Sequence, residues 1–178
     1  GDEPYNGPES RNLGDRCIMT GVATYAIMSL PYNNVKTIVQ TDDHMMLNIE
    51  WMHFTRVFRM NDEHRPQGIM SLAGDSIGWW EGDTLVVETT NYLEKSSTSP
   101  RTEEKINLEK FTRIGEDAMQ YQITSNDPGN YTAPFTREII FDKTPDKIYE
   151  YACHEGNYGM ANILSGHRAE ERMAASQD

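Results

Sequence analysis

The sequence predicts an all-β fold: an antiparallel meander of about nine strands, closed into a barrel or stacked as a two-sheet sandwich, with one C-terminal α-helix. Short runs rich in β-branched and aromatic residues recur between residues 35 and 152. Turns of three or four residues join most of these runs, and tight turns make antiparallel neighbours. Near the C-terminus the apolar spacing changes from alternation to a helical period.

Nine strands are expected, at 35–40, 45–51, 55–60, 76–80, 84–90, 106–114, 118–125, 135–142 and 147–152. Alternation indicates which side chains share a face: Met119, Tyr121 and Ile123 lie on one side of their strand. A meander of this length must hide its edge strands, by closing or by stacking.

The last segment has apolar residues at i, i+3, i+4 and i+7, counted from Met160. This spacing predicts one helix over 158–174, with Asn157 as its N-cap. We expect the helix to lie on the β-structure.

The chain of 178 residues fits a single domain. Residues 1–34 are expected to form an irregular arm, 35–156 the β-barrel or sandwich, and 157–178 a helix and tail packed on the same domain. The start of the sequence has no apolar signal region, which fits a cytosolic chain or the mature part of an exported one. No apolar run approaches the roughly 20 residues that span a bilayer, so membrane insertion is not expected.

The chain is acidic, with 28 Asp and Glu against 16 Lys and Arg and a formal charge of −12. Nucleic acids and anionic membranes are therefore poor partners, because both need a basic surface. No phosphate-binding glycine loop and no dinucleotide fingerprint occurs, so no cofactor is expected. The partner class that remains is a small-molecule ligand or substrate, and a homodimer stays open.

The two cysteines, Cys17 and Cys153, lie near opposite ends of the chain. They are either two buried thiols or, in an oxidising compartment, a bridge that closes a loop of about 135 residues. No C-x-x-C pair occurs, so neither redox catalysis nor a zinc ribbon is supported, and no metal site is predicted.

Residues 74–78 spell G-D-S-I-G, which matches the nucleophile elbow of α/β-hydrolases. That elbow needs a strand followed by a helix, whereas here a strand, a turn and another strand follow. We therefore favour a bent strand start over a nucleophilic Ser76, although Asp75 beside it is a candidate for orienting a base.

The stretch 50–56 carries the strongest candidates for chemistry. Glu50 and His53 have a spacing used by metal ligands on helices, but this stretch has β-strand composition. In a continuous strand Glu50, Arg56 and Phe58 share one face with other apolar side chains. A carboxylate and a guanidinium in an apolar wall are either a structural salt bridge or part of a pocket.

His53 is the first candidate for general acid or base catalysis, because an imidazole titrates near working pH. A hydrogen-bonded structural histidine is the alternative. Histidines in predicted turns, His44 and His64, are expected to be solvated. The aromatic residues expected to bind a substrate are Trp51, Phe58, Trp80 and Tyr121.

Residues 149–158 join the last expected strand to the helix and contain His154 next to Cys153. His154 is a further candidate for proton transfer, because a strand end relaxes the limits that alternation sets. The alternative is a structural corner between strand and helix.

Two motifs are long and specific: G-D-S-x-G-x-W-E-G-D-T-L-V-V-E-T-T-N at 74–91 and Y-E-Y-A-C-H-E-G-N-Y-G-M at 149–160; the shorter P-E-S-R-N-L at 8–13 accompanies them. With them most of the chain resembles a largely uncharacterised family of bacterial proteins, usually exported and common in soil acidobacteria and sphingomonads. The resemblance implies a periplasmic or secreted protein and strengthens the expectation of a Cys17–Cys153 bridge. It implies no catalytic residues.

Together these features favour a cofactor-independent acid/base enzyme, a lyase, isomerase or hydrolase, that holds a small apolar or aromatic molecule in a β-barrel cavity. His53 would transfer the proton, Asp75 or Glu50 would orient it, and Arg56 would bind an oxyanion. The alternatives are a lipocalin-like binding protein without catalysis and a carbohydrate-binding accessory protein with exposed tryptophans.

Overall fold

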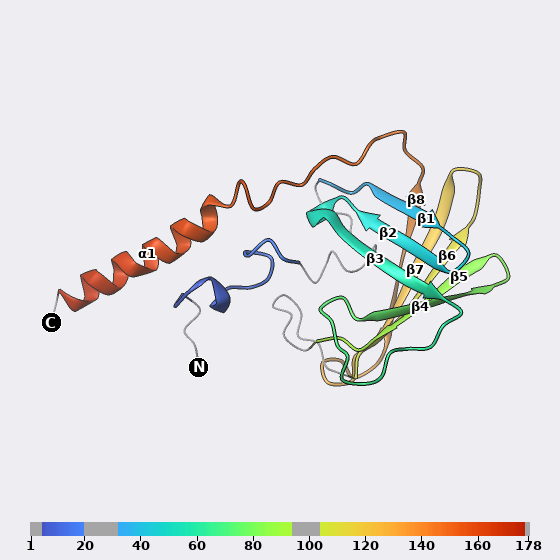
Figure 1. The fold of residues 1–178 in the computed structure, drawn as a ribbon, viewed down its shortest axis with the longest axis horizontal. Helices are drawn as coiled ribbons and strands as arrows, with labels where there is room; N and C mark the ends of the chain where they lie inside the picture. The colour runs from blue at the N-terminus through green and yellow to red at the C-terminus, as the bar shows by residue number, and fades with distance from the viewer. Residues whose placement is uncertain (1–4, 20–31, 94–103, 177–178) are drawn as a thin grey trace.

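The structure, a computed structural model, describes residues 5–19, 32–93 and 104–176 (Figure 1). Its centre is one sheet of eight strands in the order β1-β2-β3-β4-β5-β6-β7-β8. The strands are β1 (Lys36–Gln40), β2 (His44–Ile49), β3 (Phe54–Met60), β4 (Asp75–Glu81), β5 (Thr84–Thr90), β6 (Ile106–Arg113), β7 (Ala118–Asn126) and β8 (Phe135–Asp142). The helices are η1 (Pro8–Ser10), η2 (Trp51–His53) and α1 (Tyr158–Ala175). The all-β prediction with one C-terminal helix is confirmed.

Strand neighbours pair antiparallel, as the tight turns predicted, with one exception. β3 and β4 pair in parallel over only two residue pairs, Arg59 with Ile77 and Met60 with Gly78. A parallel pair needs a long connection, which residues 61–74 supply. This crossover carries His64 and Arg65, which contact Asp75 on β4.

The sheet curls into a half-barrel with β1 and β8 as its two edges (Figure 1). The ninth predicted strand, 147–152, is absent: this part of the chain is extended but joins no ladder. Its amides instead bond to side chains, since Tyr149 N donates to Glu50 and Tyr151 N donates to His53. Two backbone amides of this segment therefore donate to side chains and not to a neighbouring strand.

Of the two alternatives that the sequence left open for the cysteines, the bridge is present: Cys17 and Cys153, 136 residues apart, are bonded. It ties the N-terminal segment to the chain that follows β8. Helix α1 begins where the sequence predicted, because Asn157 caps it by accepting from the amide of Met160.

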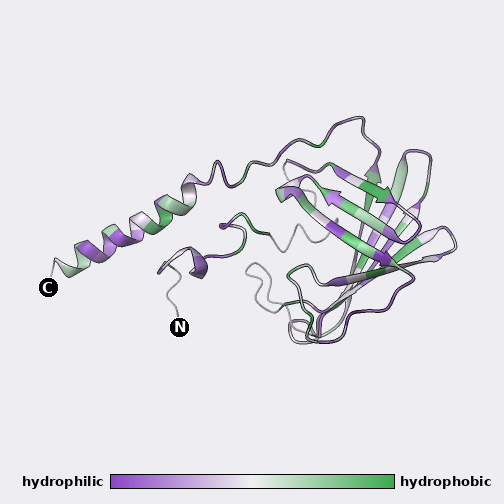
Figure 2. Cartoon of the chain, viewed as in Figure 1, coloured by the Kyte–Doolittle hydropathy of each residue, from purple (hydrophilic) through white to green (hydrophobic). Residues whose placement is uncertain are grey.

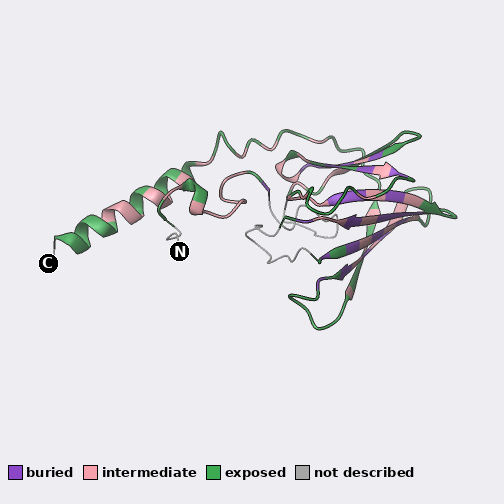
Figure 3. Cartoon of the chain, turned by 60° about the horizontal axis from the view of Figure 1, so that its bottom comes forward, coloured by how far each residue is buried: buried purple, intermediate pink, exposed green. Residues whose placement is uncertain are grey.

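Helix α1 does not lie on the sheet, which corrects our expectation. It extends away from the sheet (Figure 1), and Figure 3 shows its residues as exposed or intermediate. Its described contacts are with the N-terminal segment, where Tyr5 packs on the His167 ring and Arg168 donates to the Tyr5 carbonyl. Hydrophilic residues cover much of α1 (Figure 2), so its apolar stripe is too short to drive burial. None of the described helices combines the length and apolar character needed to cross a bilayer.

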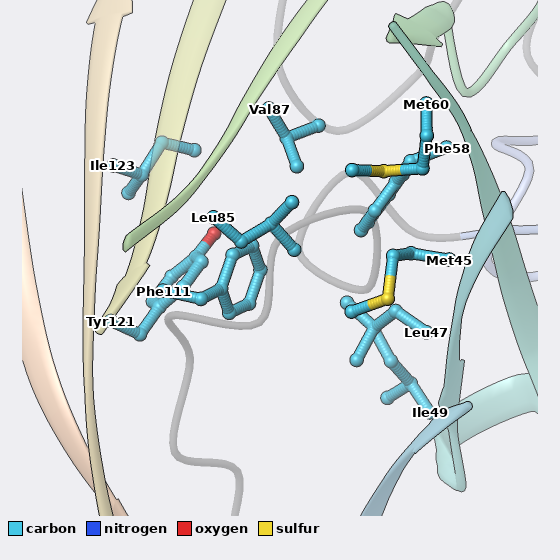
Figure 4. Packing of buried hydrophobic residues seen from close by; sticks show 10 residues of the cluster. All are labelled: Met45, Leu47, Ile49, Phe58, Met60, Leu85, Val87, Phe111, Tyr121 and Ile123. Atoms are coloured by element: carbon cyan, nitrogen blue, oxygen red, sulfur yellow. The ribbon is translucent and has the colours of Figure 1, made fainter. Parts of the chain in front are cut away.

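The core lies on the concave face of the half-barrel. Figure 4 shows side chains from facing strands pointing toward one another there, and they include Met45, Leu47, Phe58, Leu85, Phe111 and Tyr121. Alternation along each strand selects this set, as with the buried Tyr121 and Ile123 of β7. The ring centroids of Phe111 and Tyr121 are 4.8 Å apart, so aromatic packing contributes to the wall.

Candidate functional site

A cleft of about 780 Å³ lies at the seam between the edge strands β1 and β8. Strand β1 is only five residues long and mostly exposed, as is common for edge strands. The apolar part of the lining consists of Val35, Ile38, Leu47, Ala118, Met119, Ile139, Ile140 and Phe141. The volume is within the range of small-molecule sites, roughly 300–1,000 Å³. The sequence predicted an enclosed central cavity, but the concave face is packed with core side chains and the described cleft is at the seam.

Two cations on the cleft wall face the concave side. Lys36 is the register partner of Ile49, and Arg113 is the partner of Met119, so each shares a face with a core side chain. The ammonium of Lys36 lies 5.1 Å from the ring centroid of Phe141 on the opposite edge of the seam. Burial lowers the pKa of Lys36, because removal from water disfavours its charged form.

The predicted site residue Arg56 lies in the interior, not in the cleft. Its guanidinium forms a bidentate ion pair with Glu109, in which Nη1 donates to Oε1 at 2.8 Å and Nη2 donates to Oε2 at 2.5 Å. Thr89 and Ser76 also accept from Arg56, and the hydroxyl of Tyr121 donates to Glu109 at 2.7 Å. Arg56 therefore forms a structural salt bridge with Glu109 inside the half-barrel. This is the structural alternative to a pocket role that the sequence left open.

The two shifted pKa values in this network follow from burial and the ion pair. Burial alone would lower the pKa of Arg56, but the charge and hydrogen bonds of Glu109 raise it overall. Burial and the negative charge of Glu109 both raise the pKa of Tyr121. At neutral pH the network therefore holds a charged guanidinium and a neutral phenol.

Asp75 lies on the convex face, on the opposite side of β4 from Ser76 and Arg56. Its carboxylate accepts from Arg59 at 2.7 Å, from the backbone amide of Arg65 at 3.0 Å, and contacts the Nδ1 of His64 at 2.9 Å. Burial works to raise the pKa of Asp75, but these bonds outweigh it and hold the pKa well below its usual range.

His64 is a residue that the sequence analysis missed as a site component. Its Nδ1 faces Asp75, and its Nε2 is 3.1 Å from Glu88 on β5. We expected His64 in a solvated turn, whereas the parallel crossover folds that loop onto the sheet. Only the register of β3 on β4 brings a loop histidine between two carboxylates, so no local pattern could have found it.

The side chains of Glu50 and His53 accept hydrogen bonds from backbone amides of the segment after β8. The buried Glu50 carboxylate accepts from the amides of Val35 at 3.4 Å and Tyr149 at 3.3 Å. The exposed His53 accepts through Nε2 from the amide of Tyr151. The break between the two strands predicted at 45–51 and 55–60 is the short helix η2, in which Met52 and His53 have positive φ, so the strand is not continuous from Glu50 to Arg56.

The remaining predicted residues are distributed over the molecule. Phe58 and Tyr121 are buried in the core, while 45% of Trp80 is exposed. Trp51 packs between the rings of Tyr32 and Tyr151, at 4.9 and 5.0 Å. His154 is exposed in the turn before α1.

The structure thus brings together two motifs that the sequence singled out, 50–53 and 149–151, but not the four predicted catalytic groups. Glu50 and His53 bond to the segment after β8, Arg56 lies inside the half-barrel, and Asp75 lies on its convex face. The separation follows from alternation, since neighbouring strand positions face opposite sides of a sheet.

Within residues 5–19, 32–93 and 104–176, no group of three or more His, Cys, Asp and Glu side chains is arranged to hold a metal ion. Comparisons of the chain with protein-family models, curated proteins and solved structures found no match.

Proposed function

We propose that this protein binds a small, largely apolar molecule in the cleft between β1 and β8. The observation that carries the proposal is the cleft itself, which has a volume of about 780 Å³ and is lined by eight apolar side chains together with polar groups. Apolar walls with a few placed polar groups are the usual composition of small-molecule sites.

Binding suits this geometry better than the acid/base reaction that the sequence favoured. Proton transfer needs a base, its orienting group and an anion-binding group around one substrate position. Here His53 uses Nε2 for the amide of Tyr151, and Arg56 is bound to Glu109. The enzymatic hypothesis stays a prediction without an assembled site to support it.

We further propose that the protein works outside the cytoplasm, in the periplasm or after secretion. The Cys17–Cys153 disulfide supports this location, because disulfides persist in oxidising compartments and are rare in the cytosol.

The binding proposal can be tested with N-phenyl-1-naphthylamine, a neutral probe whose fluorescence rises in apolar surroundings. The probe is excited directly while it is titrated into the whole protein. We expect saturable binding of one probe per chain. Ile139→Trp, which fills the cleft with a larger side chain, should lower the affinity at least about tenfold.

Val57→Trp is the matched control, because Val57 is exposed on the convex face and does not line the cleft. Circular dichroism confirms that both variants are folded. Absence of saturable binding, or an equal loss of affinity in both variants, would overturn the proposal.

A further inference from the structure

The concave side of the cleft carries positive charge that the protein itself does not neutralise. In a chain with 28 acidic and 16 basic residues, a basic side chain has many potential partners. Lys36 and Arg113, which both line the cleft, nevertheless form no ion pair within 4.0 Å in the part of the chain that the structure describes. Arg113 is exposed, whereas Lys36 is partly buried, and a partly buried cation is costly unless something compensates its charge.

Lys36 is the clearer case of the two. Its ammonium donates to the backbone carbonyl of Asn34 at 2.9 Å and packs over the Phe141 ring. An ammonium has three donors, so this carbonyl occupies one of them. The Lys36 side chain is partly buried against the cleft wall, and this burial lowers its pKa. An anion in the cleft would offset this cost by stabilising the charged form of Lys36.

Arg113 is the second basic residue that lines this cleft. Its guanidinium uses two of its five donors, both on carbonyl oxygens of the following turn, those of Gly115 and Glu116. Arg113 is paired with Met119 on β7, and Met119 is paired with Phe141 on β8. The backbones of Arg113 and Phe141 are therefore two strand spacings, or about 10 Å, apart. Arg113 and Lys36 therefore border the same cleft, from β6 and β1 respectively.

The acidic residues around the cleft limit the charge that can enter it. Asp117 is paired with Lys143 at 3.0 Å, and Asp146 is bonded to the hydroxyl of Thr144. Asp142 follows the inward-facing Phe141 and therefore points to the convex face. Glu116 also lines the cleft, so four acidic residues border it and disfavour a ligand with several negative charges.

We infer that the ligand of the cleft is a monoanionic amphipathic molecule, with an apolar or aromatic body against Met119, Ile139 and Phe141 and a single acid group that bonds to Lys36 and Arg113. This inference rests on the proposed binding function and narrows its ligand class. Charge-assisted hydrogen bonds to a partly buried anion are about twice as strong as neutral ones, so the acid group would set affinity and orientation.

Two probes with one shared body test the inference. 8-Anilinonaphthalene-1-sulfonate and N-phenyl-1-naphthylamine have the same ring system, and only the first carries a sulfonate. We expect the anionic probe to bind the whole protein more tightly. Lys36→Met should weaken the anionic probe about tenfold and leave the neutral probe unchanged or tighter. Arg113→Met should act in the same direction, and added salt should weaken only the anionic probe.

Lys110→Met is the matched control, because Lys110 lies on the opposite face of β6 and pairs with Glu81. Lys36→Arg keeps the charge and should retain most of the anion affinity. If the two probes bind equally and no cation variant separates them, the inference is overturned while the binding function stands. If neither probe binds the folded protein, the binding function itself fails.

Discussion

Removing the Arg56 guanidinium should destabilise the half-barrel strongly. Arg56 and Glu109 are almost completely buried, and the guanidinium bonds to both carboxylate oxygens and to the hydroxyls of Thr89 and Ser76. In Arg56→Met, Glu109 keeps a hydrogen bond from Tyr121 but loses its cation. Its charge is then buried without a counter-charge inside an apolar wall.

The size of the effect follows from the burial. Breaking a buried ion pair by removing one partner costs about 3–5 kcal/mol, which is a large part of the about 5–15 kcal/mol that stabilises a domain. Replacing both partners removes the orphaned charge as well. The double variant Arg56→Met with Glu109→Met should therefore recover most of the loss, because an apolar pair of similar volume is often neutral or stabilising.

Equilibrium unfolding in urea at pH 7, followed by circular dichroism, measures these free energies. The control is Lys110→Met, which breaks the partly exposed contact of Lys110 with Glu81 at 3.5 Å and should cost about 0–1 kcal/mol. The reasoning is refuted if Arg56→Met costs less than about 1 kcal/mol, or if the double variant is less stable than the single one.

Three further predictions concern pH, the disulfide and the segment after β8. Folding lowers the pKa of Asp75, so its stabilising contribution is present above about pH 4, the usual pKa of an unfolded Asp, and is lost as the pH falls. In Asp75→Asn, the unfolding free energy measured in urea should therefore decrease less steeply as the pH is lowered below about 4. Replacing Cys17 and Cys153 by Ser should lower the unfolding free energy by at most about 5 kcal/mol, the chain-entropy value for a closed loop of 136 residues, and an unchanged urea midpoint would contradict this. Glu50→Gln leaves one of the two bonded amides without a good acceptor and should cost about 1–3 kcal/mol, with faster hydrogen exchange at those two amides as the measurement.

Local chemistry was sufficient to predict most of the fold. All eight strands begin within one residue of the predicted start, and β5 and β8 match the prediction at both ends. Alternation and turn residues act over a few positions, so they can be recognised without a structure. The Asn157 cap was found in the same way, since a side-chain acceptor followed by a helical period is a local signal.

The errors lie where distant segments compete for the same hydrogen bonds. Residues 147–152 have the composition of a strand, but Glu50 and His53 take two of their amides. The sequence predicted separate strands on either side of η2, but strand composition does not reveal that the break is a helical turn with two positive φ angles. The position of α1 depends on the disulfide and on Tyr5, both contributed by the N-terminal segment.

The sequence by itself determined the class of secondary structure, the acidic surface and the residues with chemical potential, because these are properties of composition and short-range spacing. Only the tertiary structure decided which of those residues meet. Curvature and register placed Arg56 against Glu109, Asp75 against His64, and Lys36 across an open seam from Phe141. Such pairings depend on how far a sheet curls, which is a collective outcome of its packing and is encoded in no single stretch of chain.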